Sequence, residues 1–154
     1  MVARRSLLLL AIVLVLVVAM PVTALAARSV HSTIMTGGQE APPGSGDANA
    51  RGGVRLLLDP DNSRVCFRAA WLRVGNTTAD VVNRFHIHEA PVGVDGPIHI
   101  ALFEDASFSP TDRTAACVTA DPAAIQEVQA NPDGFYCNLH SNQFPDGAIR
   151  GQLM

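Results

Sequence analysis

A His-x-His pair is the feature of this 154-residue chain best suited to chemistry. Side chains alternate between the two faces of an extended strand, so His86 and His88 project from the same side. A segment near the C-terminal end repeats this arrangement and places Tyr136, Asn138 and His140 on one face. Imidazole nitrogens bind copper and zinc ions, and three or four of them on adjacent strands can complete a coordination sphere. The pattern therefore makes His86, His88 and His140 candidate ligands of a copper or zinc ion.

His99 is a further candidate ligand, because it lies in the strand-like segment 97–103. In the alternative interpretation, the strand-borne histidines are buried, neutral and hydrogen-bonded to the backbone or to Asn138 and Arg150. Such a network would fix strand register, because a slip by one residue turns every polar side chain to the opposite face. The sequence favours this network, with the metal site as the alternative.

Short β-prone segments separated by turn signals make up most of the chain. The strand-like segments are 30–36, 54–58, 64–74, 81–89, 97–103, 114–120, 135–140 and 148–153. The stretch from Gly44 to Gly53 is small and polar and predicts an exposed connection. The segment 122–130 predicts one short helix, with Asp121 as its N-cap and Pro122 at its first position. This pattern predicts an all-β fold of about seven or eight strands, an antiparallel sandwich or barrel of the immunoglobulin-like or Cu,Zn-dismutase-like kind.

The first 27 residues predict a secretory signal peptide. Two arginines precede a long uncharged, largely apolar run, which ends at the helix-breaking Pro21 and an Ala-Leu-Ala exit at 24–26. The run is long enough to suggest an uncleaved membrane anchor as the alternative, but the proline and the small-residue exit favour cleavage. We therefore expect residues 28–154 to form one exported domain, in the extracellular space or the cell envelope.

The charge of the exported domain bears on its partners. Removal of the two signal arginines leaves 9 of the 11 basic residues against 14 acidic ones, a net charge of −5, and the chain has no lysine. The arginines are scattered along the sequence, so no basic face is expected. An acidic domain of this kind argues against nucleic acid and membranes as partners and favours an unidentified extracellular protein or ligand. Asn76 begins an Asn-Thr-Thr sequon, which matters only in a eukaryotic secretory pathway.

Three cysteines follow the signal segment. In an oxidising compartment two of them should pair, and the sequence permits three pairings. Cys66 and Cys117 both lie in strand-like segments, which favours a bond between them. Cys137 is then expected as a buried free thiol that packs as a small apolar side chain.

Four stretches, taken in order, carry a family pattern. They are 38–43 (Gly-Gln-Glu-Ala-Pro-Pro), 85–98 (Phe-His-Ile-His, then Gly-Pro-Ile), 131–140 (Asn-Pro, then Phe-Tyr-Cys-Asn-Leu-His) and 144–153 (Phe-Pro-Asp-Gly-Ala-Ile-Arg-Gly-Gln-Leu). Together they resemble the CHRD domain, which is named after chordin and also occurs alone in secreted bacterial proteins. Phe85 stands where the family usually has Ala, and Cys137 where it usually has Val.

The resemblance implies an extracellular β domain that covers nearly all of the exported chain. Family members often carry cysteines at the positions of Cys66 and Cys117, which supports that pairing. The motif residues that we expect to be structural are Glu40, Pro42, Pro43, Asn138, Arg150 and Gly151. Arg150 and Glu40 belong to motifs at the two ends of the domain, and we expect them to pair, because buried charges are usually paired. An anionic ligand of Arg150 is the alternative, and Gly151 is expected to permit close strand approach.

The sequence gives little support for an enzyme. It contains no Gly-x-Ser-x-Gly elbow and no phosphate-binding loop. The segment Phe85–Glu89 resembles the copper-ligand strand of Cu,Zn superoxide dismutases, but the chain lacks the His- and Asp-bearing zinc loop of such enzymes. The sequence thus predicts a non-catalytic extracellular binding or structural module, with a copper- or zinc-binding protein as the main alternative and a dismutase-like enzyme as a remote one.

Overall fold

The computed structural model describes residues 27–154, so the predicted signal peptide lies outside the described part except for Ala27. The eight strands are β1 Ser29–Thr36, β2 Arg51–Asp59, β3 Arg64–Leu72, β4 Val82–Glu89, β5 Ile98–Phe103, β6 Asp112–Thr119, β7 Phe135–Ser141 and β8 Ile149–Gln152. One α-helix, α1, spans Pro122–Ala130, and three 3-10 turns span Gly37–Gln39, Pro60–Asn62 and Pro132–Gly134. Within residues 27–154, no helix is both long and apolar enough to span a bilayer. The predicted all-β class and the single helix are confirmed.

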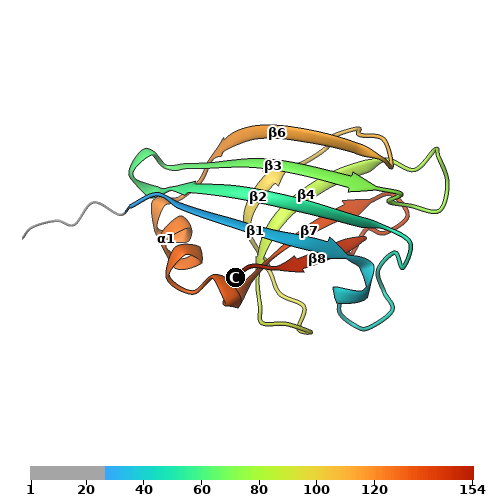
Figure 1. The fold of residues 1–154 in the computed structure, drawn as a ribbon, viewed down its shortest axis with the longest axis horizontal. Helices are drawn as coiled ribbons and strands as arrows, with labels where there is room; N and C mark the ends of the chain where they lie inside the picture. Colours follow the sequence, from blue (N-terminus) through green and yellow to red (C-terminus); the bar gives the residue numbers. More distant parts are fainter. Residues whose placement is uncertain (1–26) are drawn as a thin grey trace, which may run out of the picture.

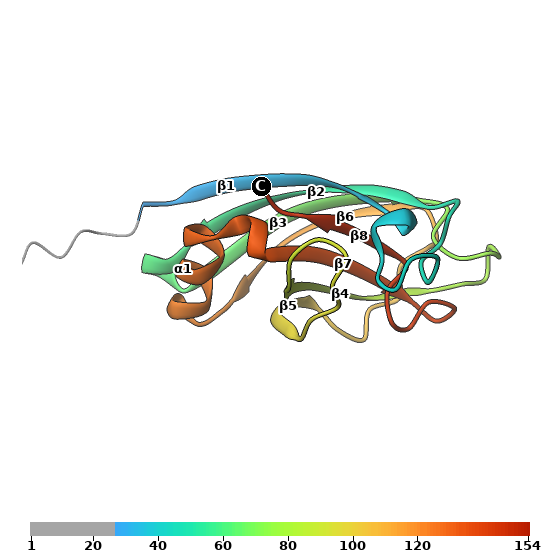
Figure 2. The same ribbon diagram turned by 90° about the horizontal axis from the view of Figure 1, so that it is seen from below.

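All eight strands belong to one antiparallel sheet in the order β5-β4-β7-β8-β1-β2-β3-β6. The sheet folds over into two layers that face each other across the core (Figures 1 and 2). The first layer is β1-β2-β3-β6 and the second is β5-β4-β7-β8. The layers join where β1 and β8 pair at Thr36 and Arg150. The structure is therefore a nearly closed sandwich or barrel, as predicted.

The core lies between the layers and is built by alternation along the strands. On β3, Val65, Phe67, Ala69 and Trp71 are all buried, and the residues between them face outward. The ring of Phe67 meets Phe85 of the second layer edge-on, with centroids 5.8 Å apart. The sequence itself shows this period-two pattern, because the apolar residues of β3 recur at every second position.

The helix α1 lies against one end of the sandwich and begins as its sequence predicts (Figures 1 and 2). The backbone N–H of Ala123 donates to the carboxylate of Asp121 at 2.9 Å, so Asp121 caps the first turn. Ile125 and Val128 are fully buried and join the core. The short helix thus gains its stability from packing as well as from its cap.

The predicted disulfide is present. Cys66 on β3 and Cys117 on β6 are directly paired in the sheet and are bonded to each other. Cys137 is a free thiol in the core, where burial raises its pKa. It therefore packs as an apolar side chain, as expected.

The stretch Gly44–Gly53 is not simply the exposed connection that its composition predicted. Strand β2 already begins at Arg51, and Asp47 is buried. The Asp47 carboxylate accepts hydrogen bonds from the backbone N–H groups of Asn49 and Gly75, which ties the loop to the body of the domain.

Gly52 lies in β2 because the strands are crowded there: a Cβ atom would be 2.9 Å from the carbonyl oxygen of Ala70.

The expectation that the scattered arginines form no basic face is also wrong. Five of the nine arginines after residue 27 occupy outward positions of the first layer and are exposed: Arg51, Arg55, Arg64, Arg68 and Arg113. The sequence separates them because they lie on three strands, and only the pairing register brings them to one face.

Candidate metal centre

The outer face of the second layer carries polar side chains that are nevertheless buried. On β4, Phe85 and Ile87 point into the core, so His86 and His88 point outward. His140 on β7 points to the same side. Loop carbonyls from residues 90–97 and 142–147 bond to the polar side chains of this face, and the three histidines are only 0%, 7% and 4% exposed.

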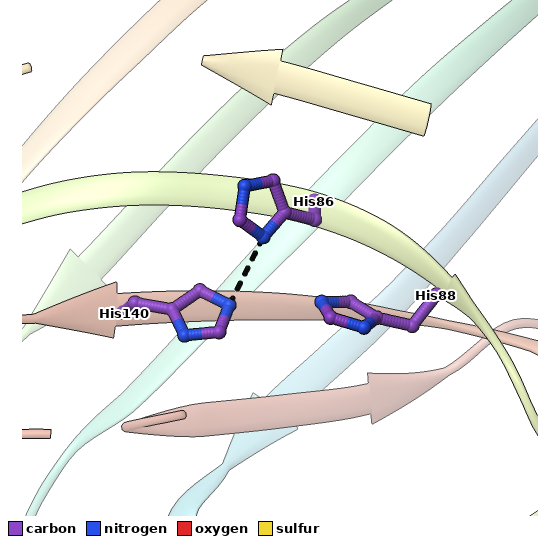
Figure 3. A group of neighbouring side chains, drawn as sticks. All are labelled: His86, His88 and His140. Carbon is purple, nitrogen blue, oxygen red and sulfur yellow. Dashed lines mark hydrogen bonds between the residues drawn. The ribbon is translucent and has the colours of Figure 1, made fainter. Parts of the chain in front are cut away.

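The three imidazole rings converge on one point. One nitrogen from each ring lies within 4.8 Å of the other two (Figure 3). Nδ1 of His86 and Nε2 of His140 are 3.1 Å apart, which is hydrogen-bond distance (dashed line in Figure 3), and which ring would donate depends on the tautomer of each. Two nitrogens on one tetrahedral zinc ion, at Zn–N distances of about 2.0–2.1 Å, are roughly 3.3–3.4 Å apart. The nitrogens of His86 and His140 thus have nearly the spacing of two ligands on one ion, and a His88 nitrogen lies within 4.8 Å of both.

The opposite nitrogen of each ring has an acceptor of its own. Nδ1–H of His88 donates to the carbonyl oxygen of Gly96 at 2.9 Å, and Nδ1–H of His140 donates to that of Pro145 at 3.0 Å. Nε2 of His86 lies 2.6 Å from the carboxylate of Glu104 and donates to it. A neutral imidazole carries a single N–H, so the three converging nitrogens hold lone pairs. Nε2 of His88 is buried and has no hydrogen-bond partner among residues 27–154.

Burial keeps these rings neutral. Desolvation is the largest influence on each of them and lowers the pKa of His86 and His88 below the usual value, although Glu104 partly raises that of His86. The pKa of His140 falls to about 3, because burial and the neighbouring His86 both disfavour its charged form. A proton shared between the rings, which would make one of them an imidazolium, is therefore disfavoured at neutral pH.

A stack of aromatic and charged groups supports His88 from one side. The ring of Tyr136 lies parallel to the His88 ring, with centroids 4.9 Å apart, and the Arg150 guanidinium sits 3.4 Å from the centre of the Tyr136 ring. The Tyr136 hydroxyl donates to Asp95 and accepts from the backbone N–H of Gly96. Because Gly96 also receives the His88 hydrogen bond, this stack and the loop 90–97 hold the imidazole in place.

Arg150 does not form the ion pair with Glu40 that the sequence suggested. Its guanidinium donates to the carbonyl oxygens of Pro91 and Val94 and to the side chain of Gln152. No ion pair joins Glu40 to Arg150 within the described residues. Two loop carbonyls and the Tyr136 ring satisfy the guanidinium instead, so Arg150 anchors the loop.

Glu40 is buried beside Asn138, its one hydrogen-bond partner, at 3.3 Å. Oε1 of Glu40 and Oδ1 of Asn138 are both buried without a partner. Burial raises the Glu40 pKa to about 8, against the lowering influence of Arg150 and Asn138. Glu40 is thus mostly protonated at neutral pH, and its neutral form avoids a buried unpaired charge.

The remaining predicted residues lie outside this centre. His99 sits next to α1, where its Nε2 donates to the carbonyl oxygen of Ala124, and it does not join the other three histidines. Pro42 and Pro43 form an exposed part of the loop between β1 and β2. Gly151 faces β1 so closely that a Cβ atom would lie 2.8 Å from the carbonyl oxygen of Ile34, which supports its predicted role in close approach.

Sequence reasoning missed the groups that orient the rings. Glu104 follows β5 and has no motif around it, while Gly96 and Pro145 act through their carbonyl oxygens and not through side chains. The hairpin between β4 and β5 was a usable signal, because it pairs His86 with Ala101 and so brings Glu104 near. No sequence pattern of this kind indicates that the carbonyl oxygens of Gly96 and Pro145 accept hydrogen bonds from the rings.

Comparison with known proteins agrees with the motifs on this face. A family model for the CHRD domain matches residues 31–153, from β1 to the residue after β8. Neither a search of curated proteins nor a search of solved structures found a match. The matched stretch contains every strand pairing described above and all three converging histidines. The chain therefore belongs to the CHRD domain family.

Proposed function

We propose that this protein is an exported, non-catalytic CHRD domain that binds one copper or zinc ion through His86, His88 and His140. The observation that carries the proposal is the direction of the three lone pairs. Each ring donates its N–H outward to its own acceptor, so three bare nitrogens face one another in a buried place. Facing lone pairs repel unless a proton or a cation lies between them.

A metal ion accounts for this arrangement better than a proton does. Metal-binding histidines typically donate their second ring N–H to a carbonyl or a carboxylate, which fixes the tautomer and the ring orientation. All three rings have such partners: two loop carbonyls and Glu104. The lowered pKa values of the rings disfavour the rival arrangement, in which an imidazolium at His86 bridges Glu104 and His140.

Export is the second part of the proposal. The N-terminal segment has the charge, length and exit residues of a signal peptide. The Cys66–Cys117 bond is typical of oxidising compartments, which agrees with export. Determining the N-terminal residue of the protein recovered from an expression host tests this part. Cleavage near Ala26 or Ala27 supports it, and an intact N-terminus on a membrane-bound protein contradicts it.

The metal proposal is tested by elemental analysis of the protein as exported, followed by chelation and titration with Zn²⁺ and Cu²⁺. We expect about one ion per chain, tighter binding of Cu²⁺ than of Zn²⁺, and a melting temperature that rises with metal. At a free ion concentration 100 times the dissociation constant, binding adds about 2.7 kcal/mol to the free energy of unfolding.

His88→Gln is the informative variant, because it removes the imidazole whose Nε2 has no partner within the domain. His99→Gln is the matched control, since His99 lies outside the cluster. We expect the first to lose the ion and the metal-dependent rise in melting temperature, and the second to keep both. A folded wild-type protein that neither carries nor binds either ion would refute the proposal, as would equal binding by the two variants.

A further inference from the structure

Five arginines lie on the outer face of the first layer, on the opposite side of the sandwich from the histidines. We define the arginine face as the outward side chains Arg51, Arg55, Arg64, Arg68 and Arg113 on β2, β3 and β6. The pairing register places Arg55 directly opposite Arg68. Arg113 lies opposite Ala70, so it is diagonal to Arg68. Figure 1 looks onto the layer that carries these strands.

The arginine face is an extended array. Arg51 and Arg55 are four residues apart on β2, and Arg64 and Arg68 are four apart on β3. Arg55 and Arg68 are opposite each other on antiparallel strands. The interval from Arg51 to Arg55 is therefore continued, in the same direction, by the interval from Arg68 to Arg64. At about 3.3 Å per residue the array from Arg51 to Arg64 is roughly 26 Å long. That length suits a polymer with repeated charges better than a single small anion.

The charges of this face are not balanced locally. Among the described residues, only Arg64 of the five has an ion-pair partner, Asp59, at 3.7 Å. Arg55 and Arg68 are like charges in directly opposed positions, which is an unfavourable cross-strand pair. The exported domain as a whole is acidic, so this local excess of positive charge is not a consequence of composition. Anionic groups on a partner would relieve the repulsion.

The shape and composition of the face narrow the choice of partner. Arg55, Arg68 and Arg113 border a shallow open groove of about 820 Å³, with Ile34 and Ala70 also in its lining. A hollowed surface fits a single extended chain better than it fits the plane of a bilayer. The outward residues of β1, β2, β3 and β6 include no aromatic side chain, so they offer no stacking platform for nucleotide bases.

We infer that the arginine face binds a linear acidic polysaccharide whose carboxylate or sulfate groups pair with the guanidinium forks. A guanidinium matches the planar geometry of such groups in a bidentate manner. An exported domain would meet polymers of this kind outside the cell. The face lies away from the histidine cluster and uses none of its residues, so this inference stands whether or not the protein binds metal.

The test measures binding of the exported protein to polygalacturonate and to heparin, with neutral dextran as a third probe. We expect binding to both acidic polymers at 50 mM NaCl, a weakening of about tenfold or more at 200 mM NaCl, and no binding to dextran. No binding to either acidic polymer at 50 mM NaCl would overturn the inference.

The variant is Arg55→Gln/Arg68→Gln, and its matched control is Arg73→Gln/Arg84→Gln. Both double variants lose two positive charges, but Arg73 and Arg84 lie outside the array, and Arg84 is on β4 of the second layer. We expect the first to weaken polymer binding at least tenfold and the control to change it less than twofold. Equal losses would mean non-specific attraction and would overturn the inference. Vesicles containing phosphatidylglycerol provide a last comparison. If the wild-type protein binds these vesicles more tightly than the polymers, and Arg55→Gln/Arg68→Gln loses that binding, the partner of the arginine face is a membrane and the inference is overturned.

Discussion

The two layers of the sandwich have outer faces that look alike in sequence and differ in structure. Both follow the alternation of apolar and polar residues that is typical of a half-buried strand. On the first layer the outward residues, such as Arg55 and Arg68, are exposed. On the second layer the outward residues His88 and Arg150 are buried and bonded to loop carbonyls. Alternation therefore identifies the outward face of a strand but not whether that face meets solvent.

This difference gives the two faces different chemistry. Buried polar groups need partners, so each outward side chain of the second layer is tied to a loop or to a neighbour. The result is a fixed arrangement in which ring tautomers and lone pairs have defined directions. Exposed charges need no fixed partner, because water solvates them. The first layer can therefore hold unpaired arginines that a mobile anionic polymer could contact.

The largest difference in stability between the two outer faces should appear when one arginine is removed from each face in turn. We expect Arg150→Ala to lower the free energy of unfolding by about 3–5 kcal/mol, because it removes a buried side chain beside Tyr136 and leaves the carbonyl groups of Pro91 and Val94 without their donor. Arg68→Ala should change it by less than about 0.5 kcal/mol. Urea unfolding of both variants measures the two values. Similar losses would show that the outer face of the second layer, which loops cover (the covered face), is no more constrained than the outer face of the first layer (the open face).

Much of the fold could be predicted, because its signals are local. The turn at 59–63 and the alternation on either side of it define the β2–β3 hairpin, and the proline and aspartate before α1 define the helix start. The Cys66–Cys117 pair agrees with neighbouring strands. The sequence placed His86 and His88 on one face of a strand and named His140 as a possible partner, but it favoured a register-fixing network over a metal site. The backbone hydrogen bonds of His88 and His140 agree with that network, and their convergence with His86 was left open.

The parts that failed depend on contacts between distant segments. The Glu40–Arg150 pair was inferred from motifs at opposite ends of the chain, but loop carbonyls of Pro91 and Val94 reach the guanidinium instead. His99 looked equivalent to the other histidines, yet it packs against α1. The arginine face needed the register of three strands at once, which no local pattern encodes.

A second prediction concerns pH and a buried acid on the covered face. The Glu40 pKa is about 8 in the folded protein and near 4.5 in an unfolded chain. Between these values the folded protein binds more protons than the unfolded chain, so this residue lowers stability as pH rises from 4.5 to 8. We expect Glu40→Gln to match the wild type near pH 4 and to be more stable at pH 8. The gain should grow by at most about 1.4 kcal/mol per pH unit.

Thermal unfolding of metal-free protein across this pH range provides the measurement. Asp61→Asn is the control, because Asp61 is an exposed acid at the 3-10 turn after β2. We expect the control to follow the wild-type pH profile. If Glu40→Gln also runs parallel to the wild type, the carboxyl is ionised in the folded protein and the covered face contains a buried charge after all.

The smallest effect should appear on the open face, where the opposed Arg55 and Arg68 repel each other. We expect Arg55→Gln/Arg68→Gln to raise the free energy of unfolding by about 0.2–1 kcal/mol at 20 mM NaCl, because the unfavourable cross-strand pair is removed. At 1 M NaCl the gain should disappear, since exposed charges are then screened over about 3 Å. Paired urea titrations at the two salt concentrations measure this difference. A loss of stability at low salt would mean that the two guanidinium groups already share an anion or pack favourably, and the open face would then resemble the covered one.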